Sequence, residues 1–110
     1  MEKQNINLSF LEKKLILLIY QEQYRLRKQG VQFEIDELSE FIFGKKVNFD
    51  FLMDFIDEIM KKNIKVIFED CLEIIKFFEY IHYNDQYITF FTLHNLEYLS
   101  QFIETLEKNY

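Results

Sequence analysis

The fold of this chain is decided by residues 48–63, NFDFLMDFIDEIMKKN, whose apolar spacing predicts one amphipathic helix. Apolar residues recur three and four positions apart and predict a buried stripe, which comprises Phe51, Leu52, Phe55, Ile56 and Ile59. The opposite face is acidic and comprises Asp50, Asp54, Asp57 and Glu58. The function therefore depends on whether this exposed surface meets nucleic acid or protein.

Upstream of this helix, the sequence predicts a long first helix that begins at a capping box. Ser9 and Glu12 have the spacing at which each side chain satisfies a backbone donor at the helix start. The apolar residues that follow keep helical spacing: Leu11, Leu15, Leu18 and Ile19. Because cations favour a helix C-terminus, the helix is expected to end at the basic cluster Arg25, Arg27 and Lys28. Gly30 then supplies a left-handed exit.

A short strand and a second helix are predicted between the two long helices. Alternation with polar residues predicts a half-buried strand at Val31, Phe33 and Ile35. Asp36 is expected to cap a helix over 37–43 that ends at Gly44. The buried residues of this helix are expected to be Leu38, Phe41 and Ile42. Lys45 and Lys46 follow in the connection, and Asn48 is the expected cap of the next helix. A strand followed by two helices and a glycine-containing turn is typical of a helix-turn-helix.

Downstream of Asn63 the spacing of the apolar residues changes to the two-residue period of strands and then returns to the period of a helix. One strand is expected at Ile64, Val66 and Phe68, followed by a turn at Glu69 and Asp70. Strands are expected in 74–83 and 87–91, with a hairpin turn at Asn84 and Asp85. The apolar run 71–78 is equally compatible with a helical turn. A last amphipathic helix is predicted by Leu96, Leu99, Phe102, Ile103 and Leu106.

These elements predict an α+β fold of winged helix-turn-helix type with an added C-terminal helix. The expected order is helix, strand, helix, helix, strand, strand, helix. A chain of 110 residues with no proline and two glycines offers no recognisable linker, so we expect one domain over 1–110. A hydrophobic content of 49% excludes a disordered chain.

The cysteine content and the length of the apolar runs indicate in which cellular compartment the protein is expected. Cys71 is the single cysteine, so neither an intramolecular disulfide nor a cysteine-based zinc site is expected. The longest apolar run, 15–20, is far shorter than the ~20 residues of a membrane span. The sequence therefore predicts a cytoplasmic protein with no cofactor, no metal, no membrane association and no small-molecule substrate.

The net charge of −6 is unevenly distributed along the chain. Residues 1–46 carry eight Lys or Arg against seven Asp or Glu, whereas residues 47–110 carry five against twelve. This balance counts against a primary duplex-binding role, because phosphates require clustered cations. If the protein does bind nucleic acid, the expected contacts are Arg25, Arg27, Lys28, Lys45, Lys46, Asn48, Lys61, Lys62 and Lys65. The alternative is that cations at helix ends serve only helix electrostatics.

The pattern resembles the first winged-helix domain of plasmid replication initiators. The stretch LSFLEKKLILLIYQEQ looks like the opening helix of that family, and EIDELSEFIFG is similar to its second helix and turn. The stretch FFEYIHYNDQYITFFTLHNLEYLSQFIETL resembles its strand pair and closing helix. The resemblance implies a domain that dimerises or contacts the DNA backbone while a second winged helix reads the origin. Because the sequence ends at Tyr110, we expect either an isolated domain of a longer protein or a free-standing relative suited to protein contacts. The resemblance thus implies a role in plasmid replication or a related mobile element.

Two hypotheses follow, and an enzyme is not among them. His82, His94 and Cys71 are not accompanied by a phosphate loop, paired metal ligands or a nucleophile motif. The first hypothesis is a non-enzymatic association domain that forms a homodimer through the first helix, the hairpin or the last helix. The second is a small acidic protein that binds a partner with a basic surface by imitating nucleic acid. The aromatic residues of the hairpin are expected to divide between core and interface or to form a stacking platform; they are Tyr80, Tyr83, Tyr87 and Phe91.

Overall fold

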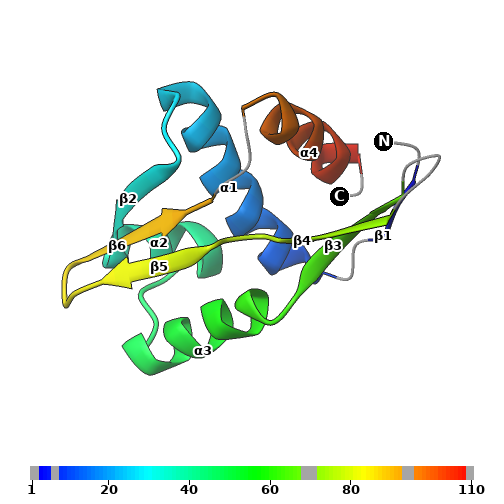
Figure 1. Cartoon of the computed structure of the whole chain (residues 1–110). Coiled ribbons are helices and arrows are strands. Elements are labelled where there is room, and N and C mark those ends of the chain that lie inside the picture. The colour runs from blue at the N-terminus through cyan, green and yellow to red at the C-terminus, as the bar shows by residue number, and fades with distance from the viewer. Residues whose placement is uncertain (1–2, 6–7, 68–71, 93–95, 109–110) are drawn as a thin grey trace.

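A computed structural model of the chain describes residues 3–5, 8–67, 72–92 and 96–108. These residues form an α+β fold of four helices and two three-stranded antiparallel sheets (Figure 1). In chain order the elements are β1 (Lys3–Asn5), α1 (Phe10–Leu26), β2 (Gly30–Glu34), α2 (Ile35–Phe43), α3 (Phe49–Met60), β3 (Asn63–Ile67), β4 (Leu72–Lys76), β5 (Tyr80–Tyr83), β6 (Tyr87–Phe91) and α4 (Leu96–Lys108).

The start of α1 confirms the predicted capping box, but its end differs from the prediction. Ser9 Oγ accepts from the Glu12 N–H at 3.2 Å, and Glu12 Oε1 accepts from the Ser9 N–H at 2.8 Å. The left-handed residue that ends α1 is Arg27, with φ of 57°, so the expected exit at Gly30 is wrong. Gly30 instead begins β2, where a Cβ atom would lie 2.5 Å from the ring of Phe91. The close approach of that ring, and not the helix end, requires glycine there.

The β2–α2 segment confirms the strand and the glycine stop, while the predicted cap is wrong. Ile35 is the first residue of α2, and Glu34 occupies the cap position without a side-chain hydrogen bond. Asp36 therefore lies within the first turn, where its negative charge interacts favourably with the positive end of the helix dipole. Gly44 ends α2 with φ of 77°, and its N–H donates to the Glu40 carbonyl at 2.8 Å.

The helix predicted at 48–63 is α3, and Asn48 caps it by accepting from the Asp50 N–H at 2.7 Å. Leu52, Ile56 and Ile59 are buried as predicted, and Phe55 is half-buried. Phe51 is 56% exposed, so its place in the buried stripe was wrong. Phe41 of α2 is likewise 45% exposed, contrary to its predicted burial. Each ring has a neighbour over part of its surface: Phe51 contacts the Phe43 ring, and the Lys14 ammonium lies 4.8 Å above Phe41.

The described part of the chain contains three strands more than the predicted order. β3 pairs with both β1 and β4, and these form a sheet separate from the β2–β6–β5 sheet. Phe77 and Phe78, between β4 and β5, are both buried, which breaks the alternation of a continuous strand. The helical alternative for 71–78 is wrong, because 72–76 is β4. Phe68, the turn at Glu69 and Asp70, and Cys71 lie outside the described residues.

The hairpin turn between β5 and β6 lies where the sequence placed it and forms without glycine. Asn84 Oδ1 accepts from the backbone N–H groups of Gln86 and Tyr87 at 2.8 and 2.7 Å. This side chain supplies bonds that a tighter turn would obtain from the backbone alone. β6 then lies between β5 and β2, with Phe90 opposite both Val31 and Ile81.

Helix α1 is central to the core, and α4 lies alongside it (Figure 1). Tyr20 of α1 is fully buried, and its hydroxyl donates to the Phe77 carbonyl at 2.8 Å. Leu99 and Leu106 of α4 join the same core, which confirms the predicted apolar face at those two positions. Among the described residues, no helix has the length and apolar character needed to cross a membrane.

Candidate functional site

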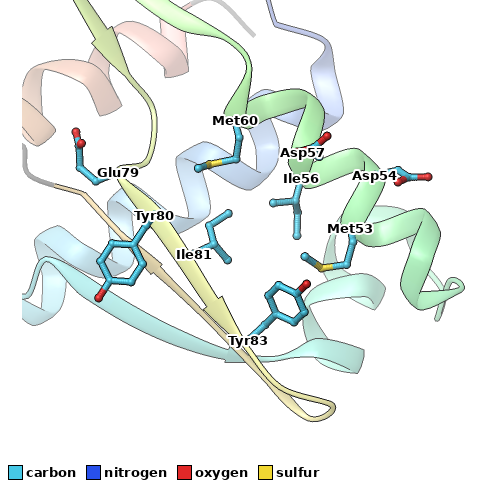
Figure 2. A pocket seen from close by; sticks show the side chains of 9 residues that line it. All are labelled: Met53, Asp54, Ile56, Asp57, Met60, Glu79, Tyr80, Ile81 and Tyr83. Atoms are coloured by element: carbon cyan, nitrogen blue, oxygen red, sulfur yellow. The ribbon is translucent and has the colours of Figure 1, made fainter.

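A groove of about 410 Å³ lies between α3 and β5 (Figure 2). The apolar part of its lining comes from both elements and comprises Met53, Ile56, Met60 and Ile81. The helical residues are three and four positions apart, so they lie on one face of α3. Ile81 and Tyr83 are two positions apart in β5, so their side chains point to the same face of the strand. Figure 2 shows both of these side chains directed toward α3 and Tyr80 directed away from it.

Two ring contacts lie at the two ends of β5. Tyr83 meets the ring of Phe49 edge to face, with centroids 5.7 Å apart, which ties β5 to the start of α3. At the other end of β5, Tyr80 stacks on Phe91 with centroids 4.3 Å apart and planes inclined by 10°. Because Tyr80 and Tyr83 lie on opposite faces of β5, the hairpin aromatics do not form one continuous platform.

The charged lining of the groove is acidic. Asp54 and Asp57 come from the exposed side of α3, and Glu79 immediately precedes β5. Asp57 pairs with Lys61 at 3.4 Å, whereas Asp54 and Glu79 have no ion pair within the described parts of the chain. Burial raises the pKa of Tyr20 well above its usual value, and the negative charge of Glu79 adds to this effect. Glu79 therefore lies close enough to the core to influence it electrostatically.

The acidic face predicted on α3 is exposed throughout, but only half of it lines the groove. Asp54 and Asp57 belong to the groove, and Asp50 lies in the first turn of the helix. Glu58 and Asp57 both contact the Lys61 ammonium, at 3.2 and 3.4 Å. These contacts raise the pKa of Lys61, first through the hydrogen bond to Glu58. Glu79, which completes the acidic rim, was not predicted, because only the tertiary fold brings β5 beside α3.

Most of the predicted phosphate-contacting residues make contacts within the protein. Their partners are Glu22 for Arg25 at 2.6 Å, Asp36 for Lys46 at 3.7 Å, Asp57 and Glu58 for Lys61, and Glu12 for Lys62 at 2.7 Å. Arg27 lies 4.5 Å from the ring centroid of Tyr24, and Asn48 is occupied as a helix cap. Lys28 and Lys45 are exposed and form no ion pair with the described residues, and Lys65 lies in β3.

The two basic groups that flank β2 lie at opposite ends of it. Arg25 and Lys28 precede the amino end of the strand, while Lys46 contacts Asp36 just beyond its carboxyl end. A five-residue strand separates the two ends by roughly 16 Å. The strand therefore holds these cations apart, and they do not form one compact cluster.

The contact between Lys62 and Glu12 was not predicted from the sequence. Glu12 is 5% exposed, and its Oε1 atom accepts from the Lys62 ammonium while also closing the capping box. Burial acts to raise the pKa of Glu12, but hydrogen bonds from Lys62 and the Ser9 N–H outweigh it, and the pKa is lowered. This ion pair joins the first turn of α1 to the end of α3 and thereby positions the helix that lines the groove.

Two of the groups weighed for catalysis fall outside the described residues. These are Cys71 and His94, whereas His82 is exposed on β5. Among the described residues, no group of three or more His, Cys, Asp or Glu side chains is arranged to hold a metal ion. In comparisons with known proteins, no family model, no curated protein and no solved structure matches this chain.

Proposed function

We propose that this protein is a non-enzymatic domain of winged-helix type that acts through association with protein. The sheet order β2–β6–β5 supports this topology, because it puts the strand between the first two helices beside the hairpin that follows the third. The β3–β4 hairpin is then an insertion between α3 and the wing formed by β5 and β6. The resemblance to the first domain of plasmid replication initiators fits the same proposal, since that domain commonly serves dimerisation.

The acidic groove is the observation that favours a protein partner over duplex DNA. In a helix-turn-helix reader, the helix equivalent to α3 enters the major groove and its flanks approach phosphates. Here Asp54, Asp57 and Glu79 line the space between that helix and the wing. Phosphates brought to this surface would be repelled, and Lys61, which contacts Asp57 at the groove, is already paired with two carboxylates. Any DNA contact is therefore auxiliary and directed to the backbone.

A gel-shift experiment at low salt tests this preference. With mixed duplex and single-stranded probes, we expect no specific shift at micromolar protein. A shift that weakens steeply with salt and is lost on replacing the predicted cations would contradict the proposal. The relevant variant carries alanine at Lys45, Lys46, Lys61 and Lys65 and keeps Lys62, because Lys62 pairs with the nearly buried Glu12.

A second candidate function is supported by the same carboxylates. The protein would then be a small acidic inhibitor or regulator of a nucleic-acid-handling partner, with the α3 surface imitating phosphate charge. The exposed carboxylates of α3 favour this candidate: Asp50, Asp54, Asp57 and Glu58. Changing Asp50, Asp54 and Asp57 to Lys would abolish binding to such a partner in a folded protein, and retained affinity would contradict this candidate.

A further inference from the structure

Strand β5 has an open edge along the groove. Within the described residues, β5 is the outer strand of the β2–β6–β5 sheet and pairs only with β6. The Asn84 N–H donates to the Tyr87 carbonyl, so Asn84 and Tyr87 are a hydrogen-bonded pair of the antiparallel ladder. Hydrogen-bonded and non-hydrogen-bonded pairs alternate along such a ladder. The backbone groups of Ile81 and Tyr83 consequently point away from β6, toward the open edge. Such an edge is a template for pairing with another chain.

We propose that an extended, basic segment of a partner protein binds in this groove by adding a strand to the edge of β5. The inference rests on the proposed role in protein association and names the chemistry of the partner. Backbone hydrogen bonds to Ile81 and Tyr83 hold the segment, as in other cases of strand addition. Side chains on its α3-facing side contact the apolar lining at Met53 and Met60.

The charge of the groove selects a basic occupant. Asp54 and Glu79 lie on opposite sides of the groove, one on α3 and one beside β5, and neither is neutralised by a described residue. Lysine or arginine side chains of a bound strand can lay their aliphatic stems on the methionines and present their charges to these carboxylates. An acidic segment or a phosphate chain would face uncompensated repulsion at the same positions.

A second copy of this chain is a poorer occupant than a basic partner. Pairing two β5 edges would bring the same carboxylates of both copies together at the interface. Each chain also carries a net charge of −6, which opposes approach through an already acidic surface. The groove is therefore assigned to a different protein, and self-association is left to other surfaces.

The test is a binding titration with defined peptides on the whole chain. The probe is a short labelled peptide of alternating Lys and Val, followed by fluorescence anisotropy at low salt. We expect saturable binding that is weaker by about tenfold or more for a peptide in which Glu replaces Lys, because the charges that face Asp54 and Glu79 are then reversed. A peptide N-methylated along one edge should also bind about tenfold more weakly, because it cannot donate to β5. Equal affinity for the N-methylated peptide would overturn strand addition.

Two double variants with the same change in charge distinguish the groove from general electrostatics. Asp54→Lys with Glu79→Lys should weaken binding about tenfold or more, whereas Glu37→Lys with Glu40→Lys, on α2 outside the groove, should change it by less than about twofold. Equal losses in both would overturn the site. Asp54→Asn with Glu79→Gln keeps the shapes and should give an intermediate loss, and circular dichroism checks that every variant folds.

Failure of this inference is distinguishable from failure of the proposed function. If the chain dimerises and shifts no DNA but binds none of the peptides, only the proposal of a basic segment in the groove is contradicted. If the chain shifts DNA specifically and binds no peptide, both this proposal and the proposed function are contradicted. Backbone amide shifts in an NMR titration add a direct readout, because strand addition should perturb Ile81 and Tyr83 while leaving α4 unaffected.

Discussion

At the scale of single residues, the pair of Glu12 and Lys62 has the largest structural consequence among the ion pairs described. Glu12 is nearly buried and serves two roles, because it closes the capping box and accepts from a lysine fifty positions away. The other ion pairs involve side chains that are mostly exposed, and such pairs contribute little to stability. The position of α3 against α1 therefore depends on one carboxylate more than on the surface charges around it.

Glu12→Gln should lower the free energy of unfolding at pH 7 by about 1–2 kcal/mol, since the amide can still cap the helix but leaves Lys62 without its charge partner. Because the pKa of Glu12 is lowered on folding, its contribution is present above the unfolded pKa near 4.5 and is lost as the pH falls below it. Urea unfolding at pH 7 and pH 3 measures both effects, and the difference between wild type and variant should shrink at pH 3.

Glu104→Gln is the matched control for this variant. Glu104 pairs with Lys108 at 2.8 Å on α4, but both side chains are largely exposed. The hydrogen bond from Lys108 lowers the pKa of Glu104, yet solvent screens this pair. The control should unfold at the same urea concentration as the wild type, and an equal loss in both variants would contradict the special role of Glu12.

At the scale of elements, the connection between α2 and α3 is held by a buried hydroxyl. Ser39 Oγ donates to the Lys45 carbonyl at 3.0 Å and accepts from the Val47 N–H at 2.8 Å. These two bonds fix the loop that sets where α3 begins, immediately before the Asn48 cap. The orientation of the groove therefore depends on a side chain outside the groove.

Ser39→Ala should destabilise the protein by about 1–3 kcal/mol, because the Val47 N–H and the Lys45 carbonyl both lose their partner. The midpoint of urea unfolding measures this loss. Ser100→Ala, at an exposed position of α4, is the control and should leave the midpoint unchanged. An unchanged midpoint for Ser39→Ala would mean that the connection is held by other contacts.

At the scale of the whole molecule, several large apolar side chains from different elements stay on the surface. They include Phe10 on α1, Phe51 on α3 and Ile74 on β4, which are 64%, 56% and 60% exposed. Contiguous apolar surface is typical of association sites, whereas single exposed apolar residues are common on any protein. The acidic groove opposes self-association through the free edge of β5, so the homodimer proposed for this protein would use the first helix or the last helix.

Light scattering at micromolar concentration tests the dimer. We expect a molar mass twice that of the 13.7 kDa chain, and a mass that stays at 13.7 kDa would contradict it. In the dimer, Phe10→Ser should shift the equilibrium toward monomer if α1 forms the interface, because a buried ring would be lost. Phe51→Ser is the matched change on α3 and should leave the mass unchanged.

Elements whose signals are local could be predicted from the sequence alone. The capping box at Ser9, the cap at Asn48, the stop at Gly44 and the turn at Asn84 each depend on bonds between residues close in the chain. The apolar period placed α3 within a few residues, because burial of one helix face is recorded in its own spacing. The acidic character of α3 was readable for the same reason.

Which surfaces lie together depends on contacts between residues that are distant in the chain. The groove needs β5 to lie beside α3, and the ion pair needs residues 12 and 62 to meet, and no local spacing encodes either approach. The burial of Phe78, at the point where the strands divide between two sheets, likewise depends on packing against Tyr20 and Phe90. The physical reason is that periodicity specifies which face of an element is buried, whereas the partner that buries it is chosen by contacts distant in the chain.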